Sequence, residues 1–116
     1  MTTPVSHVWA VRIKKDGPAL LALHGPGLES GWVAIRGDFI EVQQGPVARR
    51  LTGTDYRFCA REAWLSVAPA AFGREWLVIT GTSDGQPAFV SVSPGSRVRL
   101  EQMWHALVAA GARPER

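Results

Sequence analysis

The sequence has 116 residues with 46% hydrophobic and 20% charged residues, values typical of one globular domain with a core of its own. No apolar run reaches the roughly 20 residues that a membrane-spanning helix needs, and the start of the chain lacks the pattern of a secretory signal. We therefore expect one cytoplasmic domain over residues 1–116. The single cysteine, Cys59, excludes an internal disulfide.

The net charge of +3 comes almost entirely from arginine, since the chain has eleven arginines, two lysines and no asparagine. This bias is typical of a GC-rich bacterial genome, and we expect a bacterial source. A small positive excess permits an anionic partner without requiring one, so a solvated surface is the favoured interpretation.

Residues 8–15 alternate between apolar and polar positions, with Trp9, Val11 and Ile13 on one side, which predicts a half-buried strand. A turn follows it. Residues 19–23 are short and apolar, and their alanines and leucines suit either a returning strand or a helical turn.

Two extended runs, 32–36 and 38–43, are joined tightly around Gly37 and predict a hairpin. A Gly-Pro turn and a short basic strand over 47–51 follow this hairpin. The expected inward positions of the hairpin are Val33, Ile35, Ile40 and Val42.

The run from Tyr56 to Ala68 divides into two parts. Its first half, 56–62, suits either an irregular crossing or a turn of helix, and its second half alternates like a strand. A loop with Phe72 as an apolar plug leads to two further strands, 75–80 and 88–92, which glycine and Asp-Gly turn residues join into a hairpin.

Near residues 96–110 the period changes to that of a helix, because four apolar residues follow the i, i+3, i+4, i+7 spacing. Ser93 and Ser96 are candidates for the N-cap, and Gly111 suits the C-terminal end. The apolar stripe consists of Leu100, Met103, Trp104 and Leu107.

About seven short strands followed by one helix predict a mainly β fold, a small antiparallel barrel or sandwich that the helix caps. The order of elements over about residues 31–111 resembles the bacterial pleckstrin-homology-like (PH-like) domains. The resemblance rests on the strand, Gly-Pro turn and basic strand of residues 39–50, the hairpin of residues 76–92, and the helix bearing Trp104.

The PH-like resemblance implies a binding scaffold for protein partners or, in some members, lipid headgroups, and it implies no catalysis. The basic signature of the phosphoinositide-binding members is not recognisable around Arg12, Lys14 and Lys15. This departure favours protein partners over lipids.

The clearest catalytic motif is Gly81-Thr82-Ser83-Asp84-Gly85, which matches G-x-S-x-G, the nucleophile elbow of serine hydrolases. That elbow needs a helix after the serine, whereas here a strand is expected, so we interpret the motif as a hairpin turn. The histidines His7, His24 and His105 have no metal-ligand spacing with one another or with Cys59. We expect no catalytic residue, metal or cofactor.

The expected function is that of a non-catalytic protein-interaction adaptor or assembly subunit, with a protein partner or a second copy of the chain as its ligand. The alternative is an anion-binding module for nucleic acid or an acidic membrane surface, built on the arginine pairs. Large aromatic residues on an outer face favour protein binding, and arginines favour anions. The candidate partner-binding residues are Trp32, Trp64, Arg49, Arg50, Arg57 and Arg61.

Overall fold

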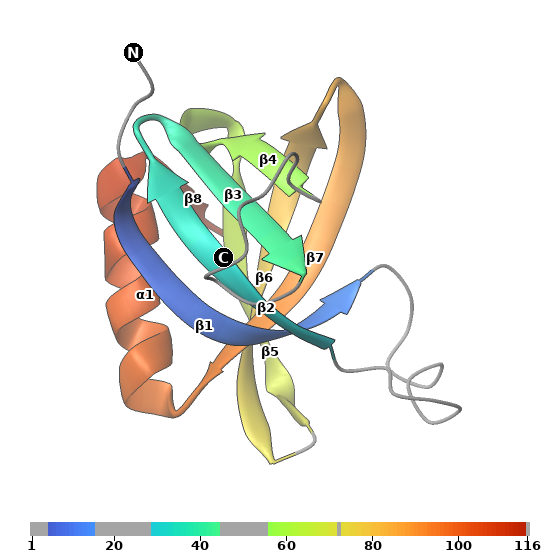
Figure 1. The fold of residues 1–116 in the computed structure, drawn as a ribbon, viewed down its shortest axis with the longest axis vertical. Coiled ribbons are helices and arrows are strands. Elements are labelled where there is room, and N and C mark those ends of the chain that lie inside the picture. The colour runs from blue at the N-terminus through green and yellow to red at the C-terminus, as the bar shows by residue number, and fades with distance from the viewer. Residues whose placement is uncertain (1–4, 16–28, 45–55, 72, 116) are drawn as a thin grey trace.

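A computed structural model of the chain describes residues 5–15, 29–44, 56–71 and 73–115. Within these ranges the chain forms strands, one α-helix and one 3-10 turn (Figure 1). The run 19–23, expected as a strand or a helical turn, the expected strand at 47–51 and the apolar plug at Phe72 lie outside the described residues. The elements are β1 (Val5–Lys15), β2 (Glu29–Arg36), β3 (Phe39–Gln44), β4 (Tyr56–Cys59), η2 (Ala60–Glu62), β5 (Trp64–Ala71), β6 (Arg74–Ser83), β7 (Gln86–Gly95), α1 (Arg97–Ala110) and β8 (Arg113–Pro114).

The sheet closes on itself as a six-stranded antiparallel barrel. Its strand order is β4-β3-β2-β1-β7-β6, and a pairing of β4 with β6 at Phe58 and Ser83 completes the ring. Strands β5 and β8 are additional, since β5 pairs with the other edge of β6 and β8 pairs with β5. The fold is therefore mainly β, with a closed barrel rather than a sandwich.

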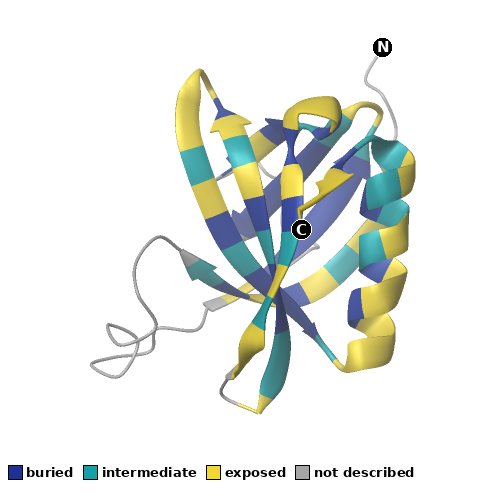
Figure 2. Cartoon of the chain, turned by 180° about the vertical axis from the view of Figure 1, so that it is seen from behind, coloured by how far each residue is buried: buried dark blue, intermediate teal, exposed yellow. Residues whose placement is uncertain are grey.

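The β2–β3 hairpin forms in the register that the sequence predicts, with Val33 opposite Val42 and Ile35 opposite Ile40. All four side chains are buried in the core. The expected alternation of β1 is also confirmed, because Val11 and Ile13 are buried and Trp9 packs against the core. Figure 2 shows the result as buried and exposed bands that alternate along the strands.

The undecided region 56–62 contains both a strand and a turn. Tyr56 and Phe58 point into the core from β4, while Arg57 between them is exposed. The 3-10 turn η2 follows, and the backbone N–H of Ala60 donates to the carbonyl oxygen of Asp38 at 2.8 Å. This hydrogen bond ties the turn to the tip of the β2–β3 hairpin.

The helix α1 agrees with its predicted bounds and caps. Ser96 is the N-cap, its side chain accepts a hydrogen bond from the backbone N–H of Arg99 at 3.2 Å, and Gly111 ends the helix with a φ of 123°. Of the predicted stripe, Leu100, Met103 and Leu107 are buried in the barrel core, whereas Trp104 is only partly buried. The helix therefore caps the barrel through three aliphatic side chains, with Trp104 at the margin.

After the helix, the chain returns to the barrel as β8, which pairs in parallel with the start of β5. The backbone N–H of Arg113 donates to the carbonyl oxygen of Ala63 at 2.9 Å, and that of Glu115 donates to Leu65 at 2.7 Å. No helix among the described residues is long and apolar enough to cross a membrane.

Candidate binding surface

An open pocket of about 390 Å³ lies between α1 and the strands β5 and β6. It is large enough for a small ligand or one or two side chains of a partner. Its apolar lining comes from Val67, Leu100 and Trp104. Val67 is 58% exposed although it continues the inward-facing row of Ala63 and Leu65, because β5 extends beyond the closed barrel at this point.

The charged side chains that line the same pocket include more negative groups than positive ones. Arg97 and Glu101 pair with each other across one helical turn at 3.5 Å. Glu75 of β6 is partly buried, and no described residue forms an ion pair or hydrogen bond with its carboxylate. Two carboxylates and one guanidinium line the pocket beside the imidazole of His105, so with a neutral histidine the pocket is locally acidic in a chain whose net charge is positive.

One edge of β5, beside this pocket, is open with respect to the described residues. The carbonyl oxygens of Ala63 and Leu65 accept from backbone N–H groups of the segment 113–115, so every second residue directs its backbone groups to this edge, and Val67 is the next one. No described strand pairs with the edge beyond Leu65. Pro69, the following residue of this set, has no N–H, which confines strand addition to the neighbourhood of Val67.

Of the two tryptophans among the candidate partner-binding residues, Trp64 lies on the surface. It is 41% exposed, and the guanidinium carbon of Arg113 lies 5.5 Å from its ring centroid. Its cross-strand neighbour is Thr80 of β6. The cross-strand neighbour of Thr80 on its other side is Phe89 of β7, which is 44% exposed. Trp64 and Phe89 thus flank Thr80 on the outer face of the sheet, away from the pocket.

Trp32 is buried, with only 5% of its surface exposed. It alternates with the inward-facing Val33, as predicted, yet it is not available as an exposed aromatic residue. Its indole Nε1 and the side-chain Oε1 of Gln43, its cross-strand neighbour, are both buried with no hydrogen-bond partner among the described residues. A contact between Trp32 and a partner therefore stays a prediction, for a side chain that the fold buries.

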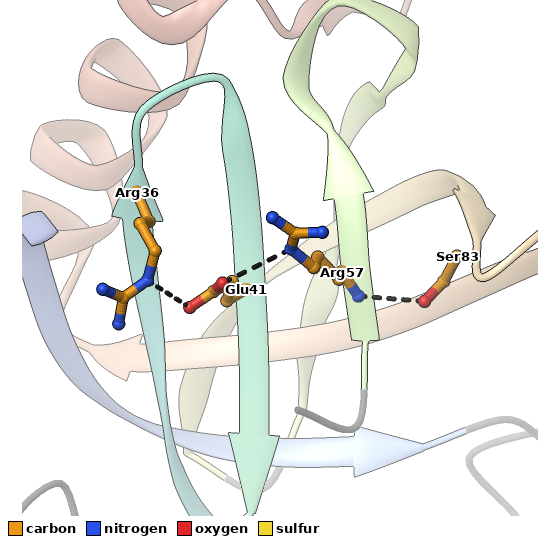
Figure 3. Close-up of polar contacts among 4 residues, drawn as sticks. All are labelled: Arg36, Glu41, Arg57 and Ser83. Atoms are coloured by element: carbon orange, nitrogen blue, oxygen red, sulfur yellow. Dashed lines mark hydrogen bonds and ion pairs between the residues drawn. The ribbon is translucent and has the colours of Figure 1, made fainter. Parts of the chain in front are cut away.

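Arg57 is engaged in the fold (Figure 3). Its Nε lies 3.5 Å from Oε2 of Glu41, and its guanidinium lies 3.7 Å from the ring centroid of Phe39. Arg36 contacts the other oxygen of Glu41 at 3.1 Å. Glu41 is buried and is shared by both arginines, so part of the positive charge of Arg57 is already compensated.

Arg61 lies in the exposed turn η2, and its stem packs against the end of α1 at Gly111. A Cβ atom at Gly111 would come within 2.9 Å of Cγ of Arg61, so this contact and the positive φ both require glycine there. Arg49 and Arg50 lie outside the described residues. The grouping of the six predicted residues in one surface therefore stays a prediction.

Ser83, the serine of the G-x-S-x-G motif, ends β6 at a hairpin turn, and β7 follows it. Its side chain is buried and its hydroxyl oxygen accepts a hydrogen bond from the backbone N–H of Arg57 at 2.9 Å (Figure 3). Asp84 and Gly85 adopt the positive φ angles that such a turn needs. The hairpin interpretation is confirmed, and Ser83 serves the closure of the barrel.

Sequence reasoning missed Val67 and Glu75 as surface residues. Val67 stands in an inward-facing row, and alternation alone assigns it to the core. The available signal is Pro69, which is compatible with an edge strand and thus with incomplete coverage of its neighbours.

The described residues thus form a small closed β-barrel with two added strands, a helix that caps its core and a concave, locally acidic surface between α1 and β5. We found no protein-family model that matches the chain and no similar sequence among curated proteins.

Proposed function

We propose that this chain is a non-catalytic protein-binding module that holds a segment of a partner protein in the pocket between α1 and β5. The observation that carries the proposal is the partly buried carboxylate of Glu75, which has no counter-ion among the described residues and lies beside Val67 and Trp104. A PH-like binding scaffold would be in keeping with this function. The closed barrel with a C-terminal helix supports the comparison with such a scaffold.

The chemistry of the pocket selects a particular partner segment. A lysine or arginine of the partner would compensate Glu75, and its aliphatic stem would pack on the apolar side chains of the pocket. The indole ring of Trp104 offers a further attraction for a cation. A neighbouring apolar side chain would cover Val67, which is otherwise exposed.

The open edge of β5 positions the partner's main chain. The backbone N–H and C=O of Val67 can pair with an extended segment, a mode in which main-chain hydrogen bonds give affinity and side-chain pockets give specificity. Because Pro69 lacks an N–H, this pairing is short, and the pocket supplies most of the selectivity. The expected ligand is an extended segment with a basic residue next to an apolar one.

Selection from a displayed library of seven-residue peptides tests the proposal. We expect the selected peptides to share a lysine or arginine next to an apolar residue. Their affinity should fall about tenfold for Glu75→Gln, which removes the charge and keeps the shape of the side chain. Fluorescence anisotropy of the labelled peptides measures the change.

The matched control is Glu62→Gln, which removes the same charge from the exposed turn η2, away from the pocket lining. It should leave peptide affinity unchanged. Failure to select any peptide, or equal losses for Glu75→Gln and Glu62→Gln, would refute the proposal. Glu75 has no described polar partner, so Glu75→Gln should keep its fold, and thermal denaturation checks this.

A further inference from the structure

Two arginines from distant parts of the sequence reach the same residue of β7. Arg12 of β1 is the direct cross-strand neighbour of Ser93. Arg74, at the start of β6, donates from Nε to the hydroxyl oxygen of Ser93 at 3.2 Å and from Nη2 to its carbonyl oxygen at 3.1 Å. The barrel therefore anchors the guanidinium of Arg74 on the serine that is the cross-strand neighbour of Arg12.

Both arginines are held by serines. Ser93 is fully buried, and its hydroxyl oxygen also accepts from the backbone N–H of Gly95 at 3.3 Å, so the anchor of Arg74 has a defined position. On β2, the other strand that pairs with β1, the hydroxyl oxygen of Ser30 accepts from Nη1 of Arg12 at 2.8 Å. Side chains that are held before a ligand arrives lose little conformational freedom when it binds.

The positive charges of this pair are not compensated. Neither Arg12 nor Arg74 forms an ion pair with a carboxylate of the described residues, whereas Arg36 and Arg57 share Glu41 and Arg97 pairs with Glu101. Lys14, two residues beyond Arg12 on the same face of β1, adds a third positive charge next to Ser91.

The like charges affect each other. Desolvation by burial, and then the positive charge of Arg12, lower the pKa of Arg74 from its usual value. A ligand with negative charge would relieve this repulsion. The remaining N–H groups of both forks, Nη1 of Arg74 and Nε and Nη2 of Arg12, have no acceptor among the described residues.

We propose that Arg12 and Arg74, anchored by Ser30 and Ser93, form a binding site for a phosphate group, either free or as a monoester. Two guanidinium forks match the several acceptor oxygens and the double charge of such a group. The hydroxyl of Ser30 accepts from Arg12 and keeps its own proton to donate. This site is separate from the protein-binding pocket, because the neighbouring residue Glu75 lines that pocket instead.

Titration of the protein with inorganic phosphate, at constant ionic strength with chloride as the balancing anion, tests the site. We expect saturable chemical-shift changes at the Nε–H resonance of Arg74, which its hydrogen bond to Ser93 keeps observable. In Arg12→Gln the dissociation constant should rise at least about tenfold, the effect of losing charge-assisted hydrogen bonds. Arg12 is exposed, so this variant should keep its fold.

The matched control is Arg99→Gln, which removes the same charge from an exposed position of α1 whose side chain has no ion-pair or hydrogen-bond partner among the described residues. It should bind phosphate like the unaltered protein. Equal weakening by Arg99→Gln and Arg12→Gln would show only general attraction to a basic protein and would overturn the proposal. So would the lack of a saturable response of Arg74 in the unaltered protein, a measurement that depends on no variant.

Two further ligands distinguish the source of the phosphate group. Phosphatidic acid in phosphatidylcholine vesicles presents a monoester at a membrane, and glycerol 3-phosphate presents the same group in solution. Vesicle binding that Arg12→Gln abolishes supports a lipid headgroup as the natural source. Binding of glycerol 3-phosphate without vesicle binding supports a soluble phosphorylated compound.

Discussion

The indole N–H of Trp32 is buried with no hydrogen-bond acceptor among the described residues, and this has a measurable consequence. A buried donor without an acceptor costs about 1–3 kcal/mol, and Trp32→Phe removes the donor while keeping an aromatic ring. Opposing this gain, the smaller ring leaves a small void. We expect the free energy of unfolding to stay within about 1 kcal/mol of its original value or to rise, as measured by urea denaturation.

Trp104→Phe is the matched control, because it makes the same change at a partly exposed position where water can reach the side chain. A loss well above 1 kcal/mol for Trp32→Phe would contradict the expectation, and it would mean that an ordered water satisfies the indole.

Single residues also mark the limit of prediction from sequence. Alternation with Val33 placed Trp32 on the outer side of its strand, and the structure agrees, but alternation carries no information about what covers that side. Trp64 follows the same logic and is exposed. Arg57 was a candidate for partner binding, and only the three-dimensional pairing with Glu41 shows that much of its charge is already compensated.

Among the elements, α1 contributes to the core through Met103 more than through Trp104. Met103 is fully buried, and Met103→Ala should lower the free energy of unfolding by about 2–5 kcal/mol, the range for truncating a buried aliphatic side chain. Trp104→Ala removes more atoms but from a partly exposed position, and it should cost less. Chemical denaturation of both variants measures the two losses.

The variants Met103→Ala and Trp104→Ala also distinguish a core residue from a residue of the binding pocket. Trp104→Ala should weaken the binding of selected basic peptides because its ring lines the pocket. A larger stability loss for Trp104→Ala than for Met103→Ala would contradict the placement of Trp104 at the margin of the core.

Element prediction succeeded where local signals are strong. The helix bounds follow from Ser96, the apolar period and Gly111, and the β2–β3 and β6–β7 hairpins follow from turn residues and alternation. The sequence does not decide the structure of β4, because four residues that include Arg57 give too short a pattern to distinguish a strand from a turn. Its strand character comes from pairing with β3, a contact between separate parts of the chain.

For the whole molecule, closure of the barrel depends on a short seam. Strands β4 and β6 pair at Phe58 and Ser83, and the hydroxyl of Ser83 accepts from the backbone N–H of Arg57. In Ser83→Ala this N–H loses its acceptor, and we expect a loss of about 1 kcal/mol in the free energy of unfolding. Amide hydrogen exchange should accelerate at Arg57 while the amides of the β2–β3 hairpin keep their protection.

Uniform acceleration throughout the barrel in Ser83→Ala would contradict a local role for this seam. Neither the seam nor the phosphate site could be predicted from sequence. Each joins residues far apart in the chain, Arg57 with Ser83 and Arg12 with Ser93, and no local period or motif indicates that they are neighbours in space.

The pairing of β1 with β7 limits how early the barrel can fold while the chain is being synthesised. Ile13 lies opposite Val92, and the buried face of α1 comes later still in the chain. A ribosome must therefore synthesise most of the sequence before the first strand finds its second neighbour. Until then the chain can form its early β1–β2 and β2–β3 pairings but no closed barrel, and the apolar face of those strands stays open to chaperones.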